Sequence, residues 1–272
     1  IRATDAGSNI GTQSYTVVIA AVDRAVAKQV TPPRVLTVYD RREYANGYVN
    51  YPINGGGDVD PRGLMASIQN RETSLGFSVT VINSYDELKA ISTTELNKFS
   101  HIWDLGYKTP LTVDSAVPTL YSNYLKAGGA VFFLGENVGG FLPRDNSICS
   151  LINSISSGTA SISSYYPPYS PGGLSESISP EFLIDNNSST VTYYTPGFFS
   201  GYSTGTPISN GGPGASGVIW KTGSLSGAPA GAVVVVLDVN FLLDPTTGYG
   251  NYSGAQWDPY FARNLSLILN RK

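Results

Sequence analysis

The sequence predicts an α/β protein with an open, mostly parallel sheet and helices on both faces. Short apolar runs without polar alternation recur along the chain, which is typical of strands buried on both sides. Helix start and stop signals lie between these runs, as in parallel strands joined by crossover helices. With 272 residues, 41% of them hydrophobic, the chain is long and apolar enough for a sizeable core.

Residues 1–20 precede this pattern and predict a β-hairpin, because apolar and polar residues alternate on both sides of a turn rich in Gly and Asn. A lone hairpin is marginally stable in water, so we expect it to dock on the next domain, to pair with strands outside this chain, or to fray. Residues 21–33 predict a linker that ends at Pro32-Pro33. The first residues resemble neither a signal peptide nor a natural start, and we expect the chain to be part of a longer one.

The α/β domain is expected to extend from residue 34 to residue 272. Its predicted strands are 34–39, 77–82, 100–104, 130–134 and 231–237. Its predicted helical segments, which separate these strands, are 58–75, 84–98, 114–127 and 258–270. Asp60 and Pro61 suit the N-cap and first position of the first helix, which Gly76 ends.

Between about residues 139 and 230 the pattern breaks into Ser, Gly, Pro and Tyr. A structureless loop of this length is uncommon, so we interpret the segment as an insertion with short strands such as 191–194 and 217–220; a glycine-rich disordered arm is the alternative. Its tyrosines suit stacking on sugars or self-association if they are exposed, and form the insertion's own small core if they are buried. These tyrosines are Tyr165, Tyr166, Tyr169, Tyr193, Tyr194 and Tyr202.

Composition and charge disfavour several classes of function. The net charge is −3 and no basic run occurs, which argues against nucleic-acid binding. No stretch approaches about 18 apolar residues, so no membrane span is expected. One Cys, one His and one Met provide neither a disulfide framework nor a set of soft metal ligands. Only 14% of residues are charged, and this hydroxyl-rich composition leads us to expect an extracellular or cell-surface location.

The opening residues, Ile1-Arg-Ala-Thr-Asp-Ala-Gly-Ser-Asn-Ile-Gly-Thr-Gln-Ser-Tyr-Thr-Val17, resemble the last two strands of bacterial immunoglobulin-like and cadherin-like repeats. The resemblance implies that residues 1–20 are the tail of an immunoglobulin-like domain, with neighbouring domains of the same chain as partners. By the same resemblance, Asp5 and Asn9 are candidates for an inter-domain calcium site; a simple turn is the alternative.

Three later segments carry a second resemblance. They are Arg34-Val-Leu-Thr-Val-Tyr-Asp40, Tyr121-Ser-Asn-Tyr-Leu-Lys-Ala-Gly-Gly-Ala-Val-Phe-Phe-Leu-Gly-Glu-Asn137 and Gly231-Ala-Val-Val-Val-Val-Leu-Asp-Val-Asn-Phe-Leu242. A helix followed by Gly-Gly, a strand and a small-residue turn is similar to class I glutamine amidotransferase-like domains and their trehalose-utilisation-type relatives. The resemblance covers residues 34–138 and 230–272 and implies a flavodoxin-like or Rossmann-like fold.

Departures from this family predict that its chemistry is absent. Active members carry a nucleophilic Cys on the turn after the strand that follows Gly-Gly, where this chain has Gly135-Glu136-Asn137. Their catalytic His lies near the C-terminal end, and this chain has no His after His101. A Cys–His relay requires both groups within hydrogen-bond reach, and Cys149 and His101 occupy neither expected place. Amidotransferase activity and papain-like or caspase-like proteolysis are disfavoured, and we assign no catalytic residue.

Polar residues follow the strands where open α/β sheets bind ligands, outside the carboxyl ends and near the topological switch point. The candidate ligand-binding crevice consists of Asp40, Arg41, Asp104, Glu136, Asn137, Asp238 and Asn240. Converging carboxylates repel one another, so we expect them to bind a hard cation such as Ca²⁺, to pair with Arg41 or Arg42, or to bind sugar hydroxyls; the alternative is that they cap turns and helices. Asp58 and Asp60, in a glycine-rich loop, are weaker metal candidates, and no other cofactor is indicated.

These expectations favour a non-catalytic module of a secreted or cell-surface microbial protein that serves adhesion, carbohydrate recognition or assembly, with glycans or other surface proteins as partners. One alternative is a glycan-acting hydrolase in which Glu136 works with Asp104 or Asp238, because glycosidases require two carboxyl groups. Another is a self-assembling surface-layer or filament subunit. Carboxylates that converge in an open pocket favour the hydrolase or a cation site, whereas carboxylates capped by backbone N–H groups favour the binding module.

Overall fold

The computed structural model describes residues 2–4, 10–12, 34–38, 64–106, 108–168, 173–183, 189–239, 241, 265–266 and 268–269 of the chain. Strands β1 (Arg2–Thr4) and β2 (Ile10–Thr12) pair antiparallel in a two-stranded sheet of their own. The predicted linker 21–33 and the calcium candidates Asp5 and Asn9 lie outside the described residues. Among the helices that the structure describes, none has the length and apolarity that crossing a membrane requires.

Five parallel strands form the centre of the main sheet, and each corresponds to an apolar run that predicts a strand. They are β3 (Arg34–Val38), β4 (Ser78–Ile82), β5 (His101–Asp104), β6 (Ala130–Leu134) and β13 (Ala232–Val236). Their order is β4-β3-β5-β6-β13, and every neighbouring pair is parallel. All residues of β6 and β13 are buried, which explains why these strands contain only Ala, Val, Phe and Leu. The predicted open α/β fold is confirmed.

This strand order places the topological switch point between β3 and β5. β3 comes first in the sequence, and its neighbours are the second strand, β4, on one side and the third, β5, on the other, as in flavodoxin-like sheets. Because all five strands run in one direction, their carboxyl ends lie along one edge of the sheet. Asp104, the turn after β6 and Asp238 all belong to that edge.

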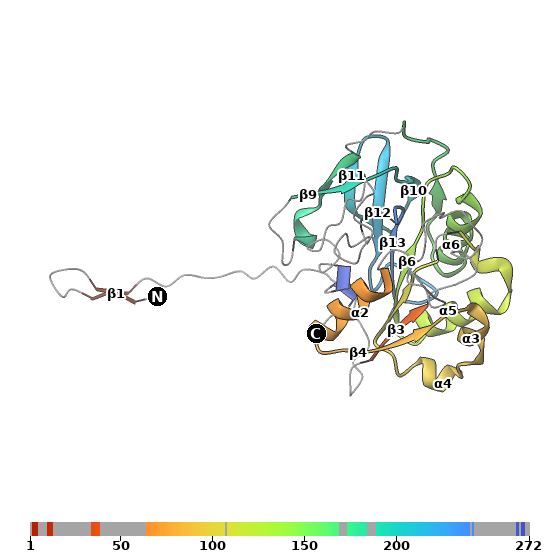
Figure 1. Ribbon diagram of the computed structural model, residues 1–272. Coiled ribbons are helices and arrows are strands. Elements are labelled where there is room, and N and C mark those ends of the chain that lie inside the picture. The colour runs from red at the N-terminus through yellow and green to blue at the C-terminus, as the bar shows by residue number, and fades with distance from the viewer. Residues whose placement is uncertain are drawn as a thin grey trace, which may run out of the picture.

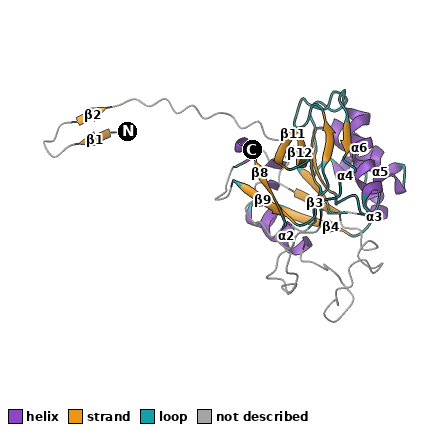
Figure 2. Cartoon of the chain, turned by 90° about the horizontal axis from the view of Figure 1, so that it is seen from above, coloured by secondary structure: helices purple, strands orange, loops and turns teal. Residues whose placement is uncertain are grey.

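Helices cover both faces of the sheet (Figure 1 and Figure 2). On one face lie α3 (Tyr85–Ala90), α4 (Thr93–Leu96), α5 (Ala116–Lys126) and α6 (Leu142–Ile155), with the short 3-10 helix η1 (Leu111–Val113). On the other face lie α2 (Leu64–Ser74) and the helical residues 265–266 and 268–269, which fall inside the predicted closing helix. Side chains of each strand alternate between the two apolar cores. In β5, Ile102 faces α3–α6 and Trp103 faces α2.

The predicted helical stretch 84–98 consists of two short helices rather than one. The Ser84 hydroxyl accepts a hydrogen bond from the Glu87 backbone N–H at the start of α3. The Ser92 hydroxyl does the same for the Glu95 N–H at the start of α4. Serine satisfies the unpaired amides of a first helical turn, so a second serine within the stretch starts a new helix.

The predicted insertion extends the same sheet. Its strands are β7 (Ala160–Ile162), β8 (Leu174–Ile178), β9 (Thr190–Tyr193), β10 (Phe199–Tyr202), β11 (Thr206–Gly211) and β12 (Gly214–Trp220), with a second short 3-10 helix, η2 (Pro180–Phe182). β12 pairs antiparallel with β13, and β11, β8 and β9 follow in that order. β10 pairs with β12 and β7, which completes an 11-stranded sheet. The strands predicted at 191–194 and 217–220 correspond to β9 and β12.

Helix α6 is an element that our interpretation of the sequence did not include. Its apolar residues Ile148, Leu151, Ile152 and Ile155 recur at helical spacing and are buried. Pro143 lies in its first turn, a position that proline favours. The signal was therefore present, within a segment whose composition is dominated by Ser, Gly and Tyr.

Candidate functional site

The carboxyl edge of the parallel strands carries four of the predicted ligand-binding residues. Asp104 ends β5, Glu136 and Asn137 form the turn after β6, and Asp238 follows β13, and all four are buried. The other predicted residues, Asp40, Arg41 and Asn240, and the metal candidates Asp58 and Asp60, lie outside the described residues.

Asp104 is fully buried, and hydrogen-bond donors surround its carboxylate. Arg144 Nη2 donates to Oδ1 at 2.9 Å, and the hydroxyls of Tyr121 and Tyr85 donate to Oδ2 at 2.6 and 3.0 Å. The backbone N–H of Gly106 donates to Oδ1 at 3.0 Å. These donors occupy the acceptor positions of the carboxylate, so Asp104 binds Arg144 and caps the loop after β5.

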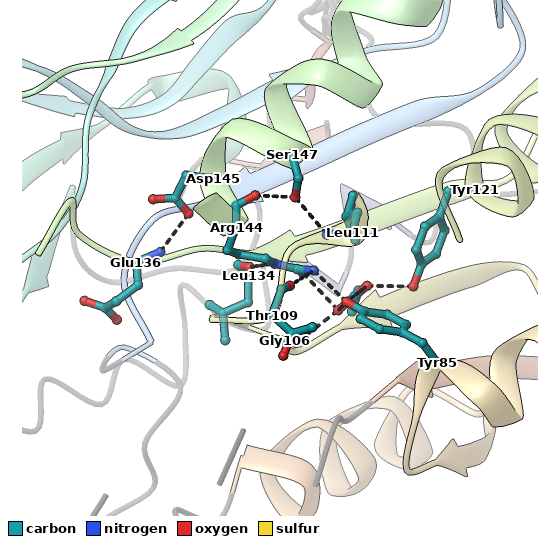
Figure 3. A network of polar contacts seen from close by, with 11 residues as sticks. Tyr85, Gly106, Thr109, Leu111, Tyr121, Leu134, Glu136, Arg144, Asp145 and Ser147 are labelled. Carbon is teal, nitrogen blue, oxygen red and sulfur yellow. Dashed lines mark hydrogen bonds and ion pairs between the residues drawn. The ribbon is translucent and has the colours of Figure 1, made fainter. Parts of the chain in front are cut away.

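Arg144 comes from the first turn of α6 and is also fully buried (Figure 3). Its Nη1 donates to the Tyr85 hydroxyl at 2.6 Å, and its Nε donates to the Leu134 carbonyl oxygen at 3.2 Å. A buried ion pair compensates for the removal of two charges from water only when its geometry is good and further hydrogen bonds are made. Both conditions are met, and the pair joins α6 to the ends of β5 and β6.

Glu136 lies in the turn after β6, and its carboxylate points away from Arg144 (Figure 3). Oε1 accepts hydrogen bonds from the side-chain amide of Asn137 at 2.8 Å and from its backbone N–H at 3.2 Å. Oε2 accepts the backbone N–H of Val239 at 3.0 Å. Because Val239 directly follows Asp238, this bond brings the turn after β6 to the end of β13.

Two buried carboxyl groups therefore interact at this point. Burial and the negative charge of Asp238 raise the pKa of Glu136 to about 8. Asp238 itself accepts the backbone N–H of Tyr194 at 2.6 Å. A second buried charge beside the first is disfavoured, which adds to the effect of burial on the pKa of Glu136.

Two further acids lie nearby. Asp145 Oδ1 accepts the Glu136 N–H at 3.2 Å, and burial raises the pKa of Asp145 well above its usual value. Glu176 on β8 accepts hydrogen bonds from the hydroxyl and the N–H of Ser216, and burial raises its pKa to about 7. Within the part of the chain that the structure describes, no three such acidic, His or Cys side chains form a group able to hold a metal ion. Asp104, Glu136 and Asp238 thus do not by themselves make the expected calcium site.

Cys149 and His101 lie on opposite faces of the sheet. Cys149, on α6, packs in the core under α3–α6, where burial raises the pKa of its thiol to about 12. His101 begins β5, at the other end of this strand from Asp104, and its ring contacts Phe77 on the α2 side. A thiolate–imidazole relay needs the two groups within hydrogen-bond reach, so these two residues do not form one.

His101 belongs instead to a buried polar group at the amino end of β5. Its Nε2 lies 3.0 Å from Glu72 Oε1 on α2, and its Nδ1 lies 2.7 Å from the Ser100 hydroxyl. Trp103 Nε1 donates to the same Glu72 oxygen at 2.8 Å. Burial by itself raises the pKa of Glu72. The attraction of His101 and the hydrogen bonds from His101, Trp103 and Ser266 together have a larger, opposite effect, so the pKa of Glu72 is lowered. Ser100, His101 and Glu72 are all buried, so they connect β5 to α2 and do not meet a substrate.

The tyrosines of segment 139–230 divide between core and surface. Tyr193 is fully buried, whereas Tyr165 and Tyr166 have 45% and 51% of their surface exposed. Tyr194 and Tyr202 are intermediate, and Tyr169 lies outside the described residues. Among the described tyrosines of this segment, Tyr193 therefore belongs to the core, and Tyr165 and Tyr166 belong to the surface.

Tyr166 lies next to the turn after β6, and Tyr165 precedes it in the chain. The Tyr165 ring packs on Phe198, with ring centroids 5.9 Å apart. Tyr166 packs on Gly139, where an added Cβ would lie only 2.8 Å from the Tyr166 ring and 2.8 Å from Asn137 Oδ1. Gly139 thus allows the exposed ring to lie close to the Asn137 side chain. Sequence reasoning did not connect this turn with the tyrosines, because the contact joins segments about 30 residues apart through α6.

No family model matches the chain, and no curated protein sequence matches it. Several solved structures are similar in fold. The cytoplasmic protein STM1381 from Salmonella typhimurium LT2 has a TM-score of 0.59 at 12% identity, over 88% of this chain and 100% of that one. The cytoplasmic protein STM3548 from Salmonella typhimurium has a TM-score of 0.58 at 12% identity and the same coverage. The exo-β-1,4-mannosidase Op5Man5 from Opitutaceae bacterium strain TAV5 has a TM-score of 0.52 at 13% identity, over 88% of this chain and 36% of that one. At such identities the likeness shows the shared α/β fold alone.

Proposed function

We propose that this chain is a non-catalytic, glycan-binding module of a secreted or cell-surface protein, in which Tyr165 and Tyr166 bind the sugar. The observation that carries the proposal is that these two neighbouring tyrosine rings are about half exposed, with the Tyr166 ring packed beside the turn at Asn137. A tyrosine ring offers a flat apolar face to the C–H face of a pyranose and a hydroxyl to its polar groups.

The segment that carries the rings is already ordered. The Ser163 N–H donates to the Phe198 carbonyl oxygen at 2.8 Å, and the Tyr165 N–H donates to the Ser163 hydroxyl at 3.1 Å. Pro167 and Pro168 follow and restrict the backbone. Tyrosines on a rigid segment lose little conformational entropy when they bind a ligand, which supports a binding role.

The surroundings favour an uncharged ligand. No charged residue occurs between positions 155 and 168 or between 195 and 220. Exposed serines on β7 and β10 add hydroxyl groups, and Ser161 Oγ lies 3.0 Å from Ser200 Oγ. These segments offer no cation to the carboxylate of an acidic sugar, so neutral sugars are the expected class.

A glycan-acting hydrolase is the second candidate. The raised pKa of Glu136 beside Asp238 favours it, because an acid–base pair needs two carboxyl groups with different proton affinities. Both groups are buried, however, and both accept hydrogen bonds from backbone N–H groups. A buried, capped carboxyl does not reach a substrate, and the binding module therefore remains our proposal.

Affinity gel electrophoresis of the full chain tests the proposal, with gels that contain a neutral β-glucan, a neutral galactomannan or, for comparison, the acidic polygalacturonate. We expect at least one neutral polysaccharide to retard the chain and polygalacturonate to leave it unaffected. The double substitution Tyr165→Ala and Tyr166→Ala should weaken binding about tenfold or more, since each aromatic contact contributes about 1 kcal/mol.

Val113→Ala is the matched control, because Val113 is an apolar side chain that is 58% exposed on a different element, η1. It should leave the retardation unchanged. Retardation that persists without both rings contradicts the site, and the absence of retardation by every neutral polysaccharide contradicts the function. If light scattering instead shows a dimer that the double substitution abolishes, the tyrosines serve self-assembly.

A further inference from the structure

A continuous set of contacts connects a buried carboxyl group to the proposed sugar site. Glu136 Oε1 accepts hydrogen bonds from both N–H groups of Asn137. Asn137 Oδ1 in turn accepts the Gly139 N–H at 2.9 Å, and the Tyr166 ring packs on Gly139. The position of Asn137 and the shape of the turn under Tyr166 therefore depend on the carboxyl group of Glu136.

Titratable groups surround Glu136 on the elements packed against it. They are Asp238 at the end of β13, Asp145 and Arg144 on α6, and Glu176 on β8, which acts on Asp238. Arg144 is bonded to Asp104, and the carboxylate of Glu136 points away from it (Figure 3). Among the described residues, no Lys, Arg or His forms an ion pair with Glu136. The described environment of Glu136 is thus acidic.

We propose that the buried carboxyl groups of Glu136 and Asp238 together retain one proton at neutral pH, and that loss of this proton in alkaline solution displaces the turn at Asn137 and weakens sugar binding at Tyr166. The inference deepens, and rests on, the proposed function of this turn and its neighbouring tyrosines. Glu136 does not touch the sugar and acts as a positioning residue. The step transfers one proton to solvent and changes no other covalent bond.

The electrostatics of the pair support this coupling. Burial and the charge of Asp238 raise the pKa of Glu136 to about 8, so mildly alkaline solution removes the proton. Both carboxylates then carry charge where water is excluded, and their repulsion falls if one of them moves toward solvent. Asn137 is buried, but Gly139 and Gly140 are exposed, so the turn after β6 has room to move outward.

Three variants of the full chain separate the contributions. Asp238→Asn removes the neighbouring charge and keeps an oxygen for the Tyr194 N–H. Glu136→Gln removes the titrating group. Glu176→Gln is the matched control, since it removes another buried carboxyl group with a raised pKa, and that group bonds Ser216 rather than Asn137.

NMR provides a readout that needs no sugar. Glutamate side-chain carboxyl carbons and the Asn137 side-chain amide are followed from about pH 5 to about pH 10. We expect one glutamate resonance, missing in Glu136→Gln, to titrate near pH 8, and the Asn137 amide to shift with the same midpoint. The midpoint should move to lower pH in Asp238→Asn and stay alkaline in Glu176→Gln.

Binding provides the second readout, in gels that contain whichever neutral polysaccharide, β-glucan or galactomannan, retards the chain. The natural chain should bind about tenfold or more weakly at about pH 9.5 than at about pH 6.5. Asp238→Asn should bind with similar affinity at both values, because ionised Glu136 no longer faces a second negative charge. Glu176→Gln should keep the loss of affinity in alkali.

The following outcomes would contradict the inference, and they distinguish its failure from failure of the proposed function. If no glutamate titrates in mild alkali, or if the Asn137 amide does not follow it, the inference fails whether or not a sugar binds. If the titration occurs and binding does not change with pH, the inference fails and the proposed function stands. If neither neutral polysaccharide binds at any pH, the proposed function fails and the inference fails with it.

Discussion

Two carboxyl groups at the same edge of the sheet are both buried, and their surroundings differ in one respect. Asp104, at the end of β5, faces the guanidinium group of Arg144 and two tyrosine hydroxyls. Glu136, after β6, faces amides and a second carboxyl group, that of Asp238. A cation compensates the first group, whereas a second acid raises the pKa of the second group. The nature of the nearest partner, and not burial alone, therefore decides how unfavourable a charge on a buried acid is.

The difference also separates a structural from a responsive region. The Asp104–Arg144 ion pair and the bond from Arg144 to Leu134 connect α6 to two strands. The Glu136–Asp238 pair lies beneath a surface turn, and we propose that it loses a proton in mild alkali. The following experiments test this contrast.

Removal of Arg144 should have the largest effect. Arg144→Met keeps much of the side-chain volume but leaves Asp104 buried without its cation, which typically costs about 3–5 kcal/mol of unfolding free energy. Urea denaturation at neutral pH measures this loss. The double variant Arg144→Met and Asp104→Asn should lose less, because no uncompensated charge remains. A loss below about 1 kcal/mol in the single variant would show that the ion pair does not hold α6 in place.

The Glu136 region should instead show stability that depends on alkaline pH. A carboxyl group with a raised folded-state pKa contributes stability that is complete below its unfolded-state value of 4.5 and is lost as the pH rises through about 8. Urea denaturation at about pH 5 and about pH 9 should reveal about 2–4 kcal/mol of pH dependence that Glu136→Gln removes, since one pKa unit corresponds to about 1.4 kcal/mol. Equal pH dependence in the variant and the natural chain would exclude Glu136 as the titrating group.

Glu72 sharpens the comparison, because its partner is a histidine. Its pKa is lowered, so its contribution is present above the unfolded-state value of 4.5 and is lost as the pH falls through the lower folded-state value. Glu72→Gln should cost about 1–3 kcal/mol at neutral pH, and the difference from the natural chain should shrink in acid. Acid unfolding curves measure both effects. Ser74→Ala, which removes a bond to the Arg71 carbonyl on the same helix, should leave the acid dependence unchanged.

The parallel half of the sheet was predictable from the sequence. β6 and β13 are buried on both sides, so their apolar character is continuous and distinguishes them from the segments around them. The antiparallel half was harder to predict, because β8 alternates exposed Ser with buried Glu176 and Ile178, a pattern that composition hides. α6 was missed for a similar reason, since Ser and Asn separate its buried apolar residues.

The positions of three acids at the ends of the parallel strands were predictable from the sequence, and their partners were not. Asp104, Glu136 and Asp238 lie along one edge, as expected of residues that follow parallel strands. Arg144 was not among the predicted residues, because it lies on α6, the helix that the prediction lacked. Gly139 and Tyr166, which contact each other, are separated in the sequence by this same helix. Contacts between distant segments leave no local pattern to detect.

Local residue patterns were thus sufficient for the parallel strands, most helices and the lack of a Cys in the turn after β6, because each is a property of a short stretch of chain. Only the tertiary structure decided which groups surround each buried acid, and that the Tyr166 ring packs on Gly139. Electrostatic energy depends on distances between side chains, and those distances exist only after the sheet and α6 have brought the residues together.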